Sequence, residues 1–282
     1  MIRSLPVKLA TGGWRASRYA EVSMILRQFL HTDPVAISYL FGCGGQATAA
    51  VVDPVGDIAP YVSAAKDTGM RILYVIDTHI HADHASSGPR LAEATGAEYV
   101  LFAEADATVP FRGVRDHEVL TLGNVTAEIL HTPGHTPEHM SVIVTDRTRS
   151  DDPWFVLTGH TLMVGDVGRT ELAATPEDGA RILFRSLRRL KALPDYLEVL
   201  PGAFSGSLCG RHLSGKPIST IGFEKRHNAA FQIEDEVEFV RLMLTDIPTP
   251  PPDAAALRAA NAGRAAAWPA KARAADARLG NR

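Results

Sequence analysis

Runs of hydrophobic residues divide the chain into short elements from Met24 onward. The segments MILRQFLH (24–31), AISYLFG (36–42) and TAAVVDP (48–54) have the β-branched and aromatic residues typical of strands. The segment IAPYVSAAKDTG (58–69) has apolar residues at helical spacing and ends on a glycine that suits a helix C-terminus. We therefore predict successive strands followed by a helix. The residues before Met24 show no clear period and are expected to form an N-terminal extension.

The middle of the chain continues the alternation of strands and helices. RILYVIDT (71–78) and EYVLFAEA (98–105) predict two strands, and SSGPRLAEATG (86–96) predicts a helix between them. Four later segments alternate β-branched and polar residues and are separated by turn residues, which predicts an antiparallel meander. These segments are EVLTLG (118–123), NVTAEILHT (124–132), MSVIVTD (140–146) and WFVLTGH (154–160).

Two helices and one short strand follow the meander. The segment 175–194 is amphipathic, with a threonine N-cap, a proline at its first position and acidic residues in its first turn. EVLPG (198–202) predicts a strand, and 233–247 predicts a helix that Pro248 stops. We predict a folded domain over 24–252, an N-terminal extension over 1–23, and an alanine-rich basic tail over 253–282 that forms a surface helix or a frayed end.

Composition narrows the class of protein. The 282 residues are 45% hydrophobic and 22% charged, and the formal net charge is −3, so nucleic acid and membrane surfaces are not expected partners. No long apolar span and no secretory signal stand out. Cys43 and Cys209 form neither a disulfide framework nor a CxxC motif, so we interpret both as ordinary thiols of a cytoplasmic protein. The sequence leaves the oligomeric state open, a homo-oligomer included.

Histidines and one aspartate gather directly after the predicted strand at 71–78. The sequence Thr78-His-Ile-His-Ala-Asp-His places His79 and His81 on one side of an extended turn. Asp83 and His84 follow at once and can face a neighbouring position. Four metal-capable side chains within six residues predict a metal site at the carboxyl end of this strand.

Two further loops carry histidines after later strands. The loop 131–139 contains a tight Pro-Gly turn that projects His135. The next loop contains His160 and continues through Gly-Asp-Val-Gly to Arg169. Because one rigid turn cannot aim three imidazoles at one point, we expect His131 and His139 to be hydrogen-bonded structural residues.

The motifs THIHADH, TPGHTPEHMS and GHTLMVGDVGR, in this order, resemble the metallo-β-lactamase superfamily over about residues 24–262. GSLCG (206–210) and STIGFEKR (219–226) further resemble persulfide dioxygenases and glyoxalase II-type hydrolases, especially forms fused to rhodanese domains. The resemblance implies an α/β fold, an αββα sandwich of two mixed sheets flanked by helices, with the metal at one edge. It also implies a small thiol, persulfide or thioester as the substrate.

The chain departs from the family pattern at two positions. His160 stands where the family has an aspartate that binds one metal or bridges two, and Ala203 stands where it has a histidine for the second metal. A neutral imidazole does not bridge two cations as a carboxylate does, and alanine has no donor atom. We therefore predict one divalent metal ion per chain, iron or zinc.

Two ligand sets are open for this ion. Zinc held by His79, His81 and His135, with His160 able to reach the same space and His84 nearby, would activate water for hydrolysis. Iron held by His79, His135 and His160 would match the positions that persulfide dioxygenases use, with one more positive charge than their two-histidine, one-carboxylate site. Asp83 is either a general base or a hydrogen-bond acceptor that orients an imidazole.

We predict a glutathione-persulfide-type sulfur dioxygenase with a mononuclear site. The first alternative is a zinc hydrolase of thioester, lactone or lactam substrates, and the second is a member that binds metal or a thiol without turnover. Arg169, Lys225 and Arg226 are expected to bind an acidic group of the substrate, such as a glutathione carboxylate. For Lys225 and Arg226, a solvated charged turn is the alternative interpretation.

Overall fold

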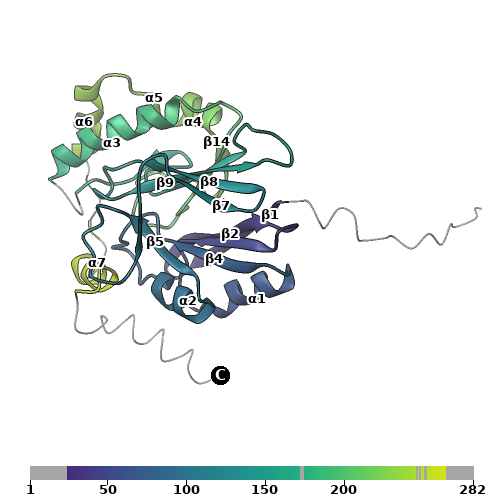
Figure 1. Cartoon of the computed structure of the whole chain (residues 1–282). Helices are drawn as coiled ribbons and strands as arrows, with labels where there is room; N and C mark the ends of the chain where they lie inside the picture. Colours follow the sequence, from purple (N-terminus) through teal and green to yellow (C-terminus); the bar gives the residue numbers. More distant parts are fainter. Residues whose placement is uncertain (1–23, 172–174, 246, 248, 251–252, 265–282) are drawn as a thin grey trace, which may run out of the picture.

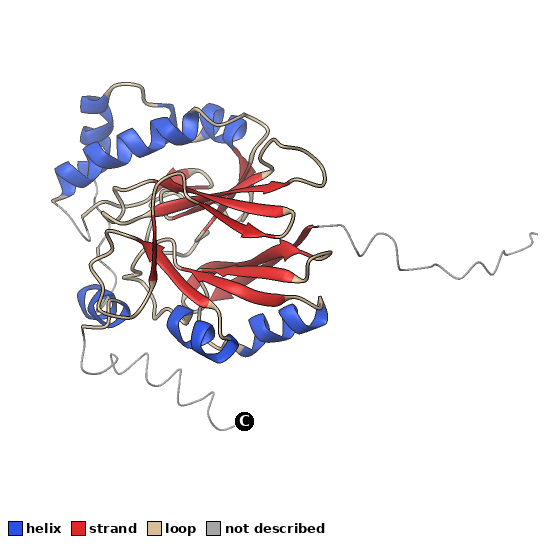
Figure 2. Cartoon of the chain, in the orientation of Figure 1, coloured by secondary structure: helices blue, strands red, loops and turns tan. Residues whose placement is uncertain are grey.

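Two six-stranded sheets form the frame of the protein. The computed structural model describes residues 24–171, 175–245, 247, 249–250 and 253–264, so the predicted extension 1–23 and most of the predicted tail lie outside the described residues. The sheets face each other with helices on both outer sides, which confirms the predicted αββα sandwich (Figures 1 and 2). Among the described residues, no helix has the length and apolar character needed to cross a membrane.

The first sheet has the order β1-β2-β3-β4-β5-β6. The pairs among β1, β2 and β3 are antiparallel. The β3–β4 and β4–β5 pairs are parallel because α1 and α2 return the chain across the outer face, and β6 pairs in parallel with β5 after a loop. The bounds are β1 (Met24–Thr32), β2 (Val35–Cys43), β3 (Thr48–Val52), α1 (Ala59–Asp67), β4 (Arg71–Ile76), α2 (Gly88–Thr95), β5 (Glu98–Phe102) and β6 (Arg112–Val114).

The second sheet has the order β14-β13-β10-β9-β8-β7. Its strands β7 to β10 form the predicted antiparallel meander, and β13 pairs in parallel with β10 after the chain crosses over through α3. The bounds are β7 (Val119–Leu122), β8 (Val125–His131), β9 (Met140–Asp146), β10 (Phe155–Gly159), α3 (Pro176–Lys191), β13 (Glu198–Pro201) and β14 (Ser219–Thr220). A small hairpin of β11 (Leu162–Met163) and β12 (Asp166–Val167) follows β10.

Apolar side chains from both sheets fill the space between them. Phe41 of β2 and Phe155 of β10 pack edge to face across this layer, with ring centroids 6.0 Å apart. Separate apolar clusters bind α1 and α2 to the first sheet and α3 to the second. Burial on both faces explains why the strands read as nearly continuous apolar runs in the sequence.

Sequence patterns predicted most of the helices and strands but missed the short ones. Helix α3 begins as predicted, because the Thr175 hydroxyl accepts a hydrogen bond from the Asp178 amide. The helix predicted over 233–247 is shorter and spans Glu236–Leu244 (α6), because Asp235 caps it. The sequence analysis did not identify β6, β11, β12, β14, α4 (Ile221–His227) or α5 (Ala229–Gln232), and the segment predicted as a surface helix or frayed end contains α7 (Ala254–Asn261).

Candidate metal centre

The three histidine loops meet at one edge of the sandwich. They follow β4, β8 and β10, and all their histidines except the partly exposed His131 are almost completely buried. Gly134 permits the second loop to lie directly against α3, since a Cβ on this residue would come 2.5 Å from the Leu183 Cα. Packing of backbone on backbone therefore fixes the turn that carries His135.

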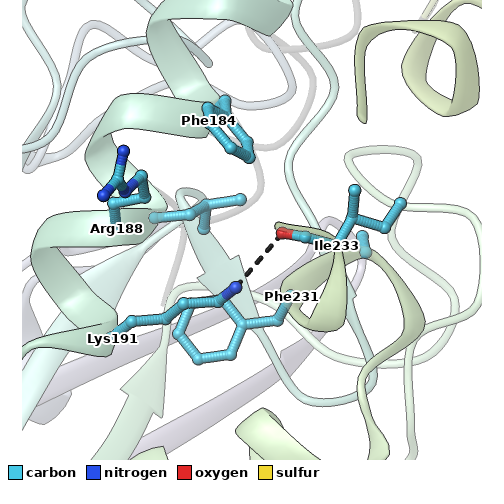
Figure 3. Close-up of a pocket in the computed structure, with 7 residues that line it drawn as sticks. Phe184, Arg188, Lys191, Phe231 and Ile233 are labelled. Carbon is cyan, nitrogen blue, oxygen red and sulfur yellow. Dashed lines mark hydrogen bonds between the residues drawn. The ribbon is translucent and has the colours of Figure 1, made fainter. Parts of the chain in front are cut away.

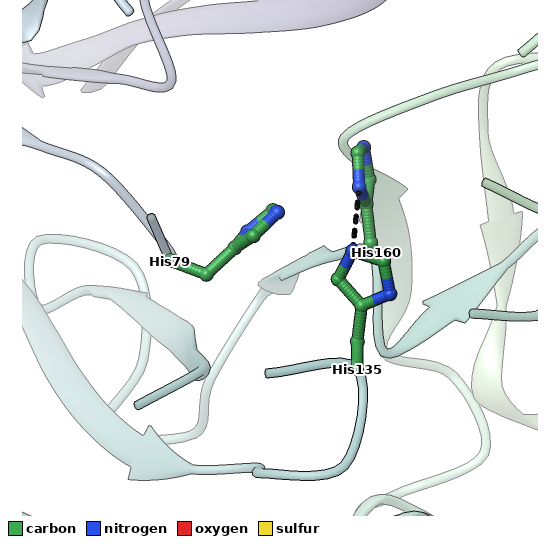
Figure 4. Close-up of side chains that lie close together, drawn as sticks. All are labelled: His79, His135 and His160. Carbon is green, nitrogen blue, oxygen red and sulfur yellow. Dashed lines mark hydrogen bonds between the residues drawn. The ribbon is translucent and has the colours of Figure 1, made fainter. Parts of the chain in front are cut away.

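His79, His135 and His160 form one candidate ligand set. One donor atom of each lies within 4.8 Å of the others, and Figure 4 shows the three rings facing a common space. The Nδ1 atom of His160 is 3.4 Å from Nε2 of His135. All three side chains are at most 1% exposed, so solvent does not compete for their nitrogens.

Hydrogen bonds fix which ring nitrogen carries the lone pair in His135 and His79. His135 Nδ1 donates to the Arg169 carbonyl at 2.7 Å, which leaves the lone pair on Nε2. The Thr78 hydroxyl donates to Asp53 and therefore accepts from His79 Nδ1 at 3.0 Å, and His79 Nε2 has no hydrogen-bond partner among the described residues. A buried lone pair such as that of His79 Nε2 fits a divalent metal ion, because burying it is costly unless something binds it.

Burial keeps these imidazoles neutral. Desolvation lowers the pKa of His135 to about 3 and that of His160 to about 4, with repulsion from neighbouring histidines adding to the effect. The pKa of His79 is also far below its ordinary value, for the same reasons. A neutral imidazole is the form that binds a metal, so the set is ready to accept one at neutral pH.

His81, Asp83 and His84 form a second group of potential ligands. His81 Nε2 lies 3.2 Å from an Asp53 carboxylate oxygen, and its other nitrogen, Nδ1, is 3.6 Å from Asp83. Burial lowers the pKa of His81, but the adjacent carboxylates, above all that of Asp53, outweigh burial and raise it well above the ordinary value. The structure thus groups His81 with Asp83 and His84, whereas His160 joins His79 and His135.

His139 and His131 have the structural contacts expected of them. The amide of His160 donates to His139 Nε2 at 3.0 Å, and His139 Nδ1 lies 3.0 Å from the Thr161 hydroxyl. The ring of His131 stacks on Phe102 with centroids 3.9 Å apart. The rings of His139 and His131 therefore support the loops around the ligand set.

The basic residues expected to bind substrate have different surroundings. The buried guanidinium of Arg169 pairs with Glu171 and also donates to the carbonyls of Leu208 and Thr249. Lys225 forms an ion pair with Asp195, and Arg226 is exposed. Their contacts with a substrate remain a prediction.

The sequence analysis missed the residues of α7 that hold the first histidine loop. Arg258 donates to the Ile80 carbonyl at 2.8 Å and forms two hydrogen bonds with Glu138, which itself accepts from the Ile80 amide. Asn261 donates to the carbonyls of His81 and His84, both at 2.8 Å. No local motif marks Arg258 or Asn261, because their partners are far away in the sequence.

Another hollow of the described surface lies between α3 and α5, away from these loops. Figure 3 shows it lined by Phe184, Phe231 and Ile233, with Lys191 donating to the Ile233 carbonyl at 3.2 Å. None of the histidines lines this depression. The histidine cluster is therefore the stronger candidate for chemistry.

Comparison with known proteins agrees with this fold. The family model described as "Metallo-beta-lactamase superfamily" matches residues 34–202. Human mitochondrial persulfide dioxygenase ETHE1 is 26% identical in a match that covers 78% of this chain and 80% of the human protein. A hydroxyacylglutathione hydrolase of Rhodospirillum rubrum is 30% identical in a match that covers 58% of this chain and 60% of the hydrolase. The crystal structure of a metallo-beta-lactamase from Staphylococcus aureus superposes with a TM-score of 0.82 at 32% identity, covering 88% of this chain and 75% of that one.

Proposed function

Because this chain belongs to the metallo-β-lactamase superfamily, we propose that it is a sulfur dioxygenase that oxidises a glutathione-type persulfide at a single iron ion. The observation that supports the proposal is the grouping of donor atoms from His79, His135 and His160, whereas His81 Nε2 lies 3.2 Å from an Asp53 carboxylate oxygen. This is the iron-binding set of the dioxygenase interpretation, in which an imidazole replaces the carboxylate. Similarity to ETHE1 over most of both chains supports the same assignment.

The number and the charge of the three imidazole ligands determine what the site can bind. A ferrous ion held by three protein ligands would offer open positions to a persulfide sulfur and to oxygen. The protein contributes no negative charge through this ligand set, so an anionic persulfide would compensate the charge of the ion. The hydrogen bonds of His79 to Thr78 and of His135 to Arg169 orient the ligands before any substrate arrives.

Asp83 is the candidate general base. Burial raises the pKa of its carboxyl, but nearby His84 and His160, together with hydrogen bonds, outweigh burial and hold the pKa well below its ordinary value. The ionised carboxylate can accept a hydrogen bond from the S–H of an incoming persulfide, although its lowered pKa makes it a weak base for removing the proton. We propose that Lys225 and Arg226 attract the carboxylates of the substrate and that Arg169 fixes the loop beside His135.

Metal analysis and oxygen uptake test the proposal. Protein purified without added metal should contain close to one iron per chain, and glutathione persulfide should consume oxygen with one sulfite formed per oxygen used. His79→Ala should lose both the iron and the uptake. Protein that contains zinc, or that consumes no oxygen when loaded with iron, would contradict the proposal.

A thioester hydrolase that uses zinc is the second candidate. The group of His81, Asp83 and His84 favours it, as does the similarity to hydroxyacylglutathione hydrolase. Cleavage of S-lactoylglutathione by the zinc-loaded protein, without oxygen uptake, would select this function. Metal binding without either activity would select a protein that binds metal or a thiol and has no turnover.

A further inference from the structure

Helix α7 contributes Asn261 to the loop that carries Asp83. This helix follows the segment 34–202 that the family model matches. The side chain of Asn261 contacts the backbone of residues 81–86, and Asp83 lies in the middle of that segment. We propose that Asn261 is a positioning residue that holds Asp83 at the metal centre. The inference rests on the proposed function, in which Asp83 accepts a hydrogen bond from the persulfide.

The carboxamide of Asn261 has a partner for both of its donors and for its oxygen. Nδ2 donates to the carbonyls of His81 and His84, both at 2.8 Å, and Oδ1 accepts from the Ser86 amide at 2.9 Å. The residue is only 6% exposed, so water does not replace these partners. An aspartate at this position would have the same size, but it could not donate to either carbonyl.

The two carbonyls depend on this side chain. They belong to His81 and His84, which are both buried, and within the described part of the chain their hydrogen bonds come from Asn261. A buried carbonyl that loses its donor destabilises the loop, which then rearranges until the carbonyl reaches water. Because the two carbonyls lie on either side of Asp83 in the chain, such a rearrangement moves Asp83.

The other contacts of Asp83 do not fix it to the sheets. Its Oδ1 atom is 3.2 Å from His84 Nδ1 and 3.6 Å from His81 Nδ1, and both rings belong to the same loop. The Cys209 thiol also approaches the carboxylate from another loop, but a thiol is a weak hydrogen-bond donor. The position of Asp83 therefore depends chiefly on the backbone that Asn261 holds.

Arg258, one turn earlier in α7, acts on a different part of the segment. It donates to the Ile80 carbonyl, next to His79, whereas Asn261 contacts residues 81–86. The ring of His79 is also held by the Thr78 hydroxyl. Loss of Asn261 should therefore displace Asp83 and leave the three-histidine set able to bind iron.

Hydrogen exchange of the metal-free protein tests whether Asn261 holds the loop. In Asn261→Asp, which keeps the acceptor and loses both donors, and in Asn261→Ala, the amides of residues 81–86 should exchange at least about tenfold faster. The amides of residues 132–139 should exchange as in the parent. Thr108→Ala is the control, because it removes a hydroxyl that donates to carbonyls at the end of α7 and leaves Asn261 in place. It should leave exchange at residues 81–86 unchanged.

Turnover of the iron-loaded protein tests whether the loop positions Asp83. Asn261→Ala should retain one iron per chain and lower kcat/KM for glutathione persulfide by about ten- to a hundredfold. In an Asp83→Asn background the same substitution should cause no further loss, because the carboxylate that it positions is already absent. An equal loss in both backgrounds, loss of the iron, or parent-like exchange at residues 81–86 in both Asn261 variants would overturn the proposal.

These outcomes separate the positioning role from the proposed oxidation. If the parent cleaves S-lactoylglutathione and does not oxidise the persulfide, the proposed function is rejected, and the two backgrounds are compared with the thioester as substrate. If the parent turns over neither substrate, exchange at residues 81–86 alone retains or rejects Asn261 as the support of the loop.

Discussion

Arg258 and Glu138 form a bidentate ion pair that connects helix α7 to the histidine loops, with Nη1–Oε1 and Nη2–Oε2 distances of 3.1 and 3.0 Å. Glu138 is part of the His135 loop, and it also accepts a hydrogen bond from the Ile80 amide between His79 and His81. One buried carboxylate therefore joins two ligand loops and the helix beyond them. The position of the ligands depends on this junction.

Removing the arginine should loosen the site. We expect Arg258→Ala to lower the free energy of unfolding by about 2 to 3 kcal/mol, somewhat less than for a wholly buried pair because the Arg258 side chain is 21% exposed. Metal affinity should fall as well, since the His79 loop loses a support. Denaturant unfolding and metal titration measure both effects.

Arg264 follows α7 and pairs with the exposed Asp106, so Arg264→Ala is the matched control. It should change stability by less than about 0.5 kcal/mol. Equal losses from Arg258→Ala and Arg264→Ala would show that the junction with Glu138 has no special role.

Removal of either predicted ligand should abolish tight metal binding. His79→Ala and His135→Ala each delete one nitrogen of a three-histidine set, and the water that enters is a poor replacement. The exposed His227 provides the control, and His227→Ala should retain a full equivalent of metal. Elemental analysis measures the metal content of each variant. A full equivalent of metal in His79→Ala or His135→Ala would show that this histidine is not a ligand.

Replacing His160 by aspartate should restore the carboxylate that the family resemblance places there. His160→Asp supplies an anionic oxygen, so it should strengthen binding of a hard dication and raise persulfide oxidation. Metal affinity, turnover and melting temperature of the variant and the parent provide the comparison. Unchanged affinity with a lower melting temperature would mean that a buried carboxylate had gained no metal partner, and His160 would then not be a ligand.

The metal-free protein should lose stability in mild acid. Burial holds the pKa of His135 at about 3 and that of His160 at about 4, whereas both titrate near 6.5 in the unfolded chain. Between these values the unfolded chain binds more protons than the native protein, so stability falls as the pH drops from about 6.5 toward 4. Each residue contributes about 1.4 kcal/mol per pH unit in that window.

Urea unfolding across pH 4 to 8 measures this dependence. His160→Gln, which does not titrate, should reduce the slope below pH 6.5. A bound metal should raise stability across this range and leave the slope from pH 6.5 to 4 unchanged, because the folded imidazoles are already unprotonated there and protons compete with the ion only near pH 4 and below. A slope that is the same in His160→Gln and in the parent would show that His160 is not held neutral by the fold.

The sequence alone determined the frame and located the candidate metal centre. The spacing of apolar residues located β1 to β5, the meander and α3, because in each of these elements the apolar residues repeat with the period of a strand or a helix. The histidines after β4, β8 and β10 could be found in the same way, since each motif is contiguous. Their convergence followed from the fold that the family resemblance implied.

Tertiary structure decided which atoms meet. Asp53 contacts Nε2 of His81, and Arg258 and Asn261 support a loop about 180 residues earlier in the chain. Cys209 approaches Asp83 only because Arg169 and Asp166 fold its loop back. Such contacts depend on packing between distant segments, and residue spacing along the chain has no information about them.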